Sequence, residues 1–315
     1  MNYTLFIIVP CYNEKAMLNE TTTRLSQILE NMQKEGLVSD HSRILYVDDG
    51  SVDSTWSMID GFCQTNPYVC GVKQAGNAGH QNALMAGLEN AVDQAHILIT
   101  VDADLQDYIN LIPEMVRKYD AGYDNVCGVR SDRDTDSFLH RKCAYGFYRM
   151  MNFLGTKTIF NHADYRLMSK RAVKQLCKFC ERNLYLRGMI LKVGYKHTCV
   201  YYSRAKRFAG EIHFPYSKLI GLALEDITSF SVKPLRLIFM AGLILVLLSV
   251  LLFTYVIRGV VVGKSVDGWP FVIMSIWLVA GLLMNGLGIL GEYIGKIYLE
   301  VKDCPRYNIE KMERL

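Results

Sequence analysis

Two aspartates one residue apart, Asp102 and Asp104, directly follow an apolar run at residues 97–101. The run is rich in β-branched side chains, which is typical of a buried strand. Two carboxylates at a strand end cannot both enter the core, because burying an unpaired charge costs too much free energy. Hard oxygen ligands in such a place suit Mg²⁺ or Mn²⁺, and Mg²⁺ usually shares its shell with substrate phosphates. The same pattern also fits a plain acidic turn, and the surrounding sequence decides between the two.

Strand and helix patterns alternate along the first hundred residues. We predict strands at residues 5–9, 43–47, 69–73 and 97–101, and helices at residues 20–35, 55–65 and 82–93. This alternation predicts a parallel sheet with right-handed crossovers. The carboxyl ends of parallel strands lie along one edge, where open α/β sheets bind ligands. The acidic residues that follow three of the strands are therefore expected at one site: Glu14, Asp48, Asp49, Asp102 and Asp104.

The middle of the chain predicts fewer regular elements. A strand at residues 125–129 leads to Arg130, a helix is expected at residues 139–154, and a strand at residues 196–202 precedes a basic cluster. Residues 161–166 precede a helix that is expected to start near residue 170. Asp164 and Arg166 in this stretch also fit a surface ion pair, which would contribute little stability. A short basic cluster is commonly a solvated face, but this one lies just before apolar segments, which favours a role in binding an anion or a lipid headgroup.

The composition narrows the class of protein. The chain has 315 residues, half of them hydrophobic, and a net charge of +4, which gives no reason to expect a nucleic-acid partner. Its nine cysteines lack paired zinc spacing and are expected to be reduced thiols in the cytosol. No G-x-G-x-x-G follows the first strand and no P-loop lysine is present, so nicotinamide cofactors and P-loop nucleotides are not expected. No signal peptide is expected either.

Two long apolar runs near the end predict transmembrane helices at about residues 235–258 and 269–294. A helix of about 20 residues rises about 30 Å, the thickness of a bilayer core. Lysine and arginine gather outside the two runs rather than between them, so the positive-inside rule places both flanks in the cytoplasm. Residues 217–230 are amphipathic and fit either a helix in the membrane interface or an ordinary packed helix.

Taken together, these motifs resemble a known family. The order P-C-Y-N-E, D-D-G-S-V-D-S-T, N-A-G-H-Q, D-A-D-L-Q-D, D-Y-R-L-M-S, R-A-K-R-F-A-G and I-T-S-F-S-V-K-P-L-R-L is similar to the polyprenyl-phosphate glycosyltransferases of family 2. That family includes bactoprenol glucosyltransferase-like and dolichol-phosphate mannose synthase-like enzymes. The resemblance covers nearly the whole chain, and it rests on the combination of motifs because each one alone is weak.

The resemblance implies a glycosyltransferase-A, Rossmann-like α/β domain that transfers a sugar from a nucleotide-sugar to a polyprenyl phosphate. By position, the nucleoside would be bound by Pro10, Tyr12, Glu14, Asp48 and Asp49. The diphosphate would be held through Mg²⁺ or Mn²⁺ by Asp102, Asp104 and Gln106. The sugar would face Arg130 and Asp164, and the lipid phosphate or the diphosphate would meet Arg204, Arg207 and His213.

The sequence departs from the family pattern on the acceptor side. Tyr108 and Ile109 follow D-L-Q-D where the family often has two prolines, and His213 stands where it commonly has lysine. Bacterial features favour undecaprenyl phosphate and a UDP-sugar, either glucose or N-acetylglucosamine. The alternatives are a GDP-mannose-using synthase and a catalytically weak membrane scaffold or lipid-carrier binder. A processive polysaccharide synthase is disfavoured because no Q-x-x-R-W motif occurs.

The predicted organisation has four parts. Residues 1–215 form the catalytic domain, residues 216–232 a juxtamembrane amphipathic helix, residues 233–298 the two transmembrane helices, and residues 299–315 a cytoplasmic tail. The resemblance implies a bacterial inner-membrane protein with its catalytic domain and C-terminus in the cytoplasm. It also implies a homo-oligomer, with a tetramer packed through the spans as one form, acting in cell-envelope glycan modification.

Overall fold

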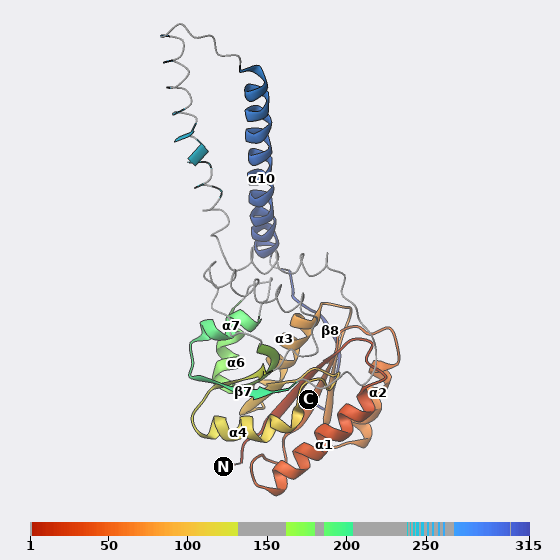
Figure 1. The fold of residues 1–315 in the computed structure, drawn as a ribbon. Helices are drawn as coiled ribbons and strands as arrows, with labels where there is room; N and C mark the ends of the chain where they lie inside the picture. The colour runs from red at the N-terminus through yellow and green to blue at the C-terminus, as the bar shows by residue number, and fades with distance from the viewer. Residues whose placement is uncertain are drawn as a thin grey trace. The chain divides into compact units, whose positions relative to one another are not determined.

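The fold of the chain is given by a computed structural model (Figure 1). It describes residues 2–131, 162–179, 186–203, 268–302 and 304–315, with scattered positions between 238 and 261. The chain forms two compact units. One comprises Met1–Arg149, Lys157–Phe214 and Cys304–Leu315, and the other Met150–Thr156 and Pro215–Asp303.

An eight-stranded sheet forms the first unit, in the order β7-β5-β6-β4-β1-β2-β3-β8. Its strands are β1 (Leu5–Cys11), β2 (Arg43–Asp48), β3 (Val69–Gln74), β4 (Ile97–Thr100), β5 (Asn125–Arg130), β6 (His162–Ser169), β7 (His197–Tyr202) and β8 (Ile309–Glu313). The first four begin at the predicted residues and run parallel to their neighbours among themselves. Their carboxyl ends therefore share one edge, which confirms the placement expected for the acidic clusters.

The sheet is mixed rather than parallel, and this corrects the sequence-based expectation. β6 runs antiparallel between β4 and β5, and β8 runs antiparallel beside β3. The stretch around Asp164, for which the sequence predicts no strand, is thus a strand inside the sheet. Asp164 and Arg166 on this strand have almost no exposed surface, so they form a buried ion pair and not the surface pair that the sequence also fits.

Helices cover both faces of this sheet (Figure 1). The helices in chain order are α1 (Leu18–Lys34), α2 (Thr55–Thr65), α3 (His80–Ala91), η1 (Ile109–Leu111), α4 (Ile112–Asp120), α6 (Lys170–Leu176) and α7 (Leu186–Val193). Alternate residues of β1, including Leu5, Ile7 and Val9, join one core cluster with α1, α2 and α4. On the other face α3 lies so close that a Cβ at Gly87 would come within 2.3 Å of Ile8. This close packing fixes the N-terminus of α3 over the carboxyl edge of the sheet.

The C-terminal segment is part of the first unit. β8 pairs with β3, and the Ala75 N–H donates to the Asn308 carbonyl at 2.8 Å. Arg306 and Tyr307 both contact the carboxylate of Glu89 on α3. Residues predicted as a cytoplasmic tail thus contribute a sheet strand and hold α3 in place.

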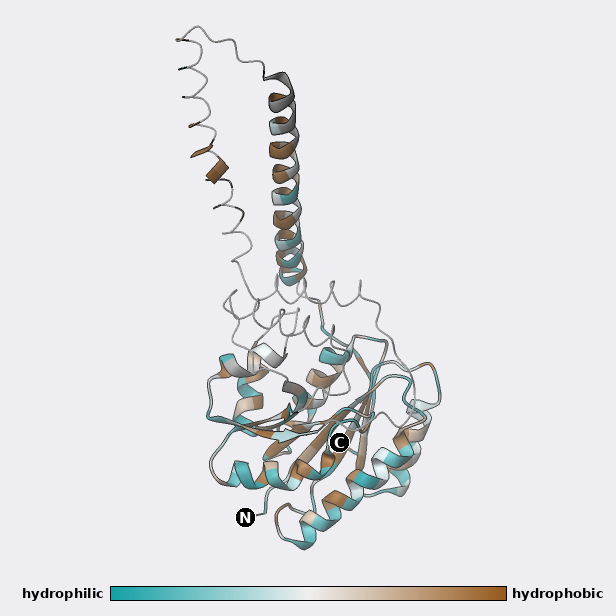
Figure 2. Ribbon diagram, viewed as in Figure 1, coloured by the Kyte–Doolittle hydropathy of each residue, from teal (hydrophilic) through white to brown (hydrophobic). Residues whose placement is uncertain are grey.

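The described core of the second unit is α10 (Trp269–Val301), which begins at the predicted residue and continues beyond residue 294. Apolar residues recur along its length (Figure 2), and many of them are exposed. Within the described residues, Leu278–Val301 is the one helical stretch long and apolar enough to cross a membrane. The predicted helices at residues 139–154 and 216–232, and most of the first predicted span, lie outside the described residues.

Candidate active site

The loops after β1 and β2 are joined by hydrogen bonds. Asn13 adopts a positive φ of 57°, and its side-chain oxygen accepts a hydrogen bond from the N–H of Val52 at 3.0 Å. The Glu14 N–H donates to the Thr55 hydroxyl at 3.0 Å, and the Asp49 N–H donates to the Cys11 carbonyl at 2.9 Å. The predicted nucleoside residues Pro10, Tyr12 and Glu14 are therefore held beside the end of β2, with 47% of Tyr12 exposed.

Asp48 and Asp49 end β2 in different environments. Asp49 accepts hydrogen bonds from the N–H groups of Ala78 (2.7 Å) and Gly79 (3.0 Å), so both its oxygens hold the loop between β3 and α3. Asp48 is fully buried, and neither of its oxygens holds a neighbouring loop as Asp49 does, although Ser51 and the charge of Lys73 lower its pKa. Loss of solvation is the main cause that raises the pKa of both carboxyls. Asp48 is thus the one with acceptor oxygens to offer a ligand.

His80, the first residue of α3, lies between two carboxylates of the site. Its Nε2 is 3.7 Å from an oxygen of Asp102 and 3.7 Å from an oxygen of Asp164. Loss of solvation raises the pKa of Asp102 to about 6, while His80 lowers it and the neighbouring aspartates raise it further. Several carboxylates therefore lie close to Asp102 at this edge of the sheet. An acidic turn on the open surface would not bring them together in this way.

Asp104 shapes the loop that follows β4. Its Oδ1 accepts a hydrogen bond from the Gln106 N–H at 3.2 Å, and Leu105 between them adopts a positive φ of 54°. This compact turn places Asp102, Asp104 and Gln106 on one short loop, as the sequence predicts. No group of three or more His, Cys, Asp and Glu side chains in the described ranges is arranged to hold a metal by itself. The oxygen donors nevertheless fit Mg²⁺ or Mn²⁺, because such ions complete their shells with water and substrate phosphate.

Arg130 ends β5 beside the same loop. Its Nη2 lies 3.3 Å from Oδ1 of Asp107, and the Tyr202 hydroxyl donates to that same oxygen. Asp107 is buried, whereas 27% of the Arg130 side chain is exposed. The guanidinium is therefore anchored at one end and open to the site at the other.

Asp164 is held by a buried arginine on its own strand. The Arg166 guanidinium donates to Asp164 Oδ1, and only 2% of the Arg166 side chain and 5% of the Asp164 side chain are exposed. The other Asp164 oxygen faces His80. Three elements, β4, β6 and α3, thus bring Asp102, Asp164 and His80 together.

The candidate residues fall into three groups. The residues predicted to contact the nucleoside and the metal, together with Arg130 and Asp164, lie at the carboxyl edge of the sheet. Arg204, Arg207 and His213 lie outside the described residues, so their predicted role with phosphate stays a prediction. The residues that sequence reasoning missed at this edge are His80, Asp107 and Tyr202, while Arg166 is buried beside Asp164 and does not form a surface pair with it. His80 and Asp107 stand inside the quoted N-A-G-H-Q and D-A-D-L-Q-D motifs, and that position was the available signal.

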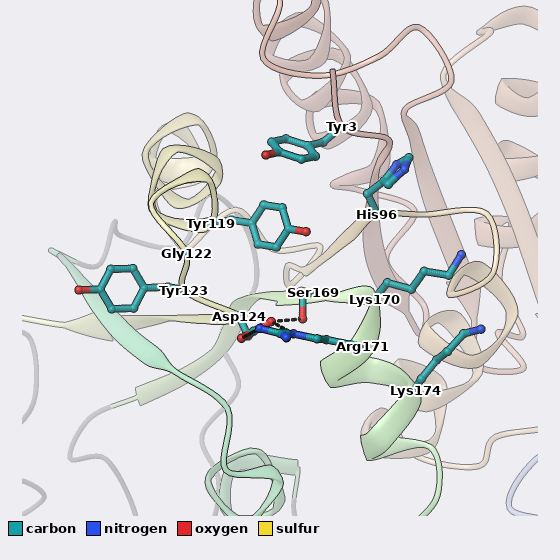
Figure 3. A pocket seen from close by; sticks show the side chains of 10 residues that line it. All are labelled: Tyr3, His96, Tyr119, Gly122, Tyr123, Asp124, Ser169, Lys170, Arg171 and Lys174. Carbon is teal, nitrogen blue, oxygen red and sulfur yellow. Dashed lines mark hydrogen bonds and ion pairs between the residues drawn. The ribbon is translucent and has the colours of Figure 1, made fainter. Parts of the chain in front are cut away.

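A cavity of about 510 Å³ lies at the opposite edge of the sheet (Figure 3). Tyr3, His96 and Asp124 stand at or near the starts of strands, rather than at their carboxyl ends. Among its charged groups, Arg171 pairs with Asp124 and Lys174 with Asp93, while the Lys170 Nζ donates to the Asp93 carbonyl. The cavity holds none of the predicted site residues, and the catalytic chemistry is expected at the other edge.

Comparison with known proteins finds relatives that match nearly the whole chain. The "uncharacterized glycosyltransferase YkoT" of Bacillus subtilis is 44% identical over 97% of this chain and 91% of its own length. The SfII prophage-derived bactoprenol glucosyl transferase of Shigella flexneri is 40% identical over 98% of both chains. A prophage bactoprenol glucosyl transferase homolog of Escherichia coli is 38% identical over 98% of this chain and 99% of its own.

One solved structure, a mannosyltransferase from Pyrobaculum calidifontis in complex with GDP-Man and Mn²⁺, is 15% identical and aligns over 97% of this chain and 89% of its own with a TM-score of 0.42. The profile of glycosyl transferase family 2 matches residues 6–177, which include β1 to β6 and the acidic edge. The chain therefore belongs to glycosyl transferase family 2. It has the glycosyltransferase-A-like α/β fold that the resemblance implies, with a mixed sheet in place of the parallel one predicted from the strand pattern.

Proposed function

We propose that this protein transfers a hexose, glucose or N-acetylglucosamine, from a UDP-sugar to undecaprenyl phosphate. The reaction inverts the anomeric carbon and gives a lipid-linked monosaccharide for cell-envelope glycan modification. The observation that carries the proposal is the end-to-end match to relatives named bactoprenol glucosyl transferase, which extends well beyond the family domain at residues 6–177.

The donor is proposed to bind across the ends of β1, β2 and β4. Tyr12 and Asp48 contact the nucleoside, with Pro10 and Glu14 shaping its pocket, and Asp49 acts through the loop it holds at Ala78 and Gly79. A buried carboxylate with unused acceptor oxygens is well suited to an N–H group of a base.

Asp102, Asp104 and Gln106 are proposed to hold Mg²⁺ or Mn²⁺. When bound, that ion supplies positive charge to the departing nucleoside diphosphate. Arg130 and Asp164 face the sugar, and the predicted contacts of Arg204 and Arg207 with phosphate use the match between guanidinium forks and phosphate oxygens. His213 adds a pH-dependent contact on the acceptor side.

The acceptor requires little activation, because a phosphate monoester is already an anion near neutral pH. The chain's task is to hold its oxygen behind the anomeric carbon, on the face opposite the diphosphate, which inverts that carbon. Catalysis therefore rests on positioning and electrostatic stabilisation rather than on a strong general base.

The lipid acceptor requires the active site to lie close to a bilayer. We propose that α10 and the predicted span at residues 235–258 cross the membrane, and that residues 216–232 lie in its interface. Exposed apolar residues along α10 support this placement, including Leu283, Met284, Leu287 and Ile294. The catalytic domain and C-terminus are proposed to be cytoplasmic in a multi-pass, homo-oligomeric protein of the bacterial inner membrane.

Asp48→Asn is expected to raise the melting temperature by a few degrees while weakening UDP binding about tenfold. The substitution removes a buried charge whose loss of solvation outweighs the stabilisation from Ser51 and Lys73. It also removes a charged acceptor for the base. Scanning fluorimetry and calorimetric titration of UDP on the purified full chain measure the two effects. Asp49→Asn is the matched control and should lower the melting temperature, because its oxygens hold two backbone N–H groups. Unchanged UDP affinity in Asp48→Asn would contradict the assignment.

The proposed activity is tested by radiolabelled transfer from UDP-glucose, UDP-N-acetylglucosamine and GDP-mannose to undecaprenyl phosphate, with Mg²⁺ or Mn²⁺, beside Asp104→Ala. Labelled lipid from a UDP-sugar, lost in the variant, is the expected result. If lipid product forms from GDP-mannose alone, the donor proposed here is wrong and the mannose synthase alternative holds. No lipid product from any donor, with folded and membrane-inserted protein, would overturn the transferase proposal and favour a scaffold or lipid-carrier binder.

A further inference from the structure

Asp107 joins three elements of the active-site edge. It ends the loop after β4 that carries Asp102 and Asp104, and only 3% of it is exposed. Its Oδ1 accepts a hydrogen bond from the hydroxyl of Tyr202, at the end of β7. The same oxygen lies 3.3 Å from the guanidinium of Arg130, at the end of β5. The proposed reaction assigns no role to this buried carboxylate.

The two partners of Asp107 are neighbours in the sheet. Arg130 and Tyr202 stand opposite each other in the parallel register of β5 and β7, and the Ser131 N–H donates to the Tyr202 carbonyl at 2.8 Å. The Tyr202 ring packs edge-on against Tyr165 with centroids 5.8 Å apart. A Cβ at Gly128 would come within 3.1 Å of Tyr202, so glycine leaves room for this ring. The ends of β5 and β7 are therefore held together by contacts that do not involve Asp107, and Asp107 connects them to the loop after β4.

Asp124 provides a direct comparison within the same strand pair. It precedes β5, about 20 Å along the strand from Arg130, and it is as buried as Asp107. Both its oxygens are engaged, by two nitrogens of Arg171 and by the Ser169 hydroxyl (Figure 3). By contrast, Asp107 Oδ2 is buried without a hydrogen-bond partner within the described ranges. A buried carboxylate left half-satisfied is a feature that proteins tolerate mainly at functional sites.

We propose that Asp107 is a positioning residue. It sets Arg130 and the end of β7 relative to the loop after β4 that carries Asp102 and Asp104. β7 leads within two residues to Arg204, the first of the arginines predicted to contact phosphate. One carboxylate would thus hold the loop after β4, which carries Asp102 and Asp104, to the ends of β5 and β7. This inference rests on the proposed transferase function and deepens it.

The test compares Asp107→Asn with Asp124→Asn in the purified full chain. Both substitutions neutralise a buried aspartate that contacts one arginine and one hydroxyl, but only one lies at the active-site edge. We expect Asp107→Asn to lower kcat about 10- to 100-fold, the usual cost of losing a residue that orients a reacting group. KM for the UDP-sugar should change by less than about threefold, because the nucleoside contacts are untouched. Asp124→Asn should lower the melting temperature and leave kcat per folded protein unchanged.

Tyr202→Phe is the second variant, and it keeps the inference testable if Asp107→Asn folds poorly. It removes the hydroxyl that donates to Asp107 and also lies against Arg130, and we expect a kcat loss of about 3- to 10-fold. In the double variant the two losses should not multiply, because both act through one contact. Wild-type kcat in Asp107→Asn and Tyr202→Phe, or equal losses in Asp107→Asn and Asp124→Asn, would overturn the inference. Inactivity of the unsubstituted protein with every donor would instead overturn the proposed function itself.

Discussion

Replacing Asp104 by asparagine is expected to lower kcat for sugar transfer about 100- to 1,000-fold, the usual effect of removing one group that stabilises developing charge. Asparagine keeps the side-chain oxygen that accepts the Gln106 N–H, so the turn after β4 should survive. What is lost is one of the negative charges proposed to hold the divalent cation. The concentration of Mg²⁺ or Mn²⁺ that gives half-maximal activity should therefore rise at least about tenfold.

The measurement is kcat against metal concentration, for wild type and variant, after removal of bound metal with a chelator. Asp93→Asn serves as a control, because Asp93 is 80% exposed and pairs with Lys174 away from the acidic edge. We expect the control to stay within about twofold of wild type. Full activity in the presence of excess chelator, or an Asp104→Asn variant as active as the control, would contradict the metal-binding role.

The parallel part of the fold was predictable because its signals are local. Each of the first four strands is an apolar run that ends at a polar cluster, and all four begin where the sequence predicts. β6 was missed because Asp164 and Arg166 stand at buried positions of the strand. Their charges are compensated only by each other and by neighbouring elements, which no local pattern reports. β8 was missed because it is short, charged and paired with a strand more than 200 residues away.

The same distinction holds for the candidate site. Asp48, Asp102 and Asp104 could be proposed from the sequence because each follows an apolar strand pattern. That local pattern alone predicts a carboxylate at the edge of the sheet. The contact of His80 with both Asp102 and Asp164 joins three elements that are far apart in the sequence. The arrangement of Arg130 and Tyr202 around Asp107 depends likewise on the register of β5 and β7. Residue types predict which groups take part in chemistry, while their mutual geometry needs the assembled sheet.

Arg166→Met is expected to reduce the free energy of unfolding by about 3–5 kcal/mol, the usual cost of removing one partner of a buried ion pair. Methionine fills much of the volume of the arginine stem, but it leaves the Asp164 carboxylate buried without its guanidinium. Asp164 lies between β4 and the N-terminus of α3, so the uncompensated charge should disturb the active-site edge as well. Scanning fluorimetry should show a fall in melting temperature of about 10 °C, accompanied by loss of transfer.

Arg171→Met is the matched control for this prediction. Arg171 also pairs with a buried aspartate, but 67% of its side chain is exposed, so water can replace much of what the guanidinium provides. Its loss should cost about 1 kcal/mol. Adding Asp164→Asn to Arg166→Met should recover part of the lost stability, since the stranded charge disappears, while transfer stays low because Asp164 is proposed to face the sugar. Equal destabilisation by Arg166→Met and Arg171→Met would contradict the prediction, because burial of the Arg166–Asp164 pair would then have no energetic consequence.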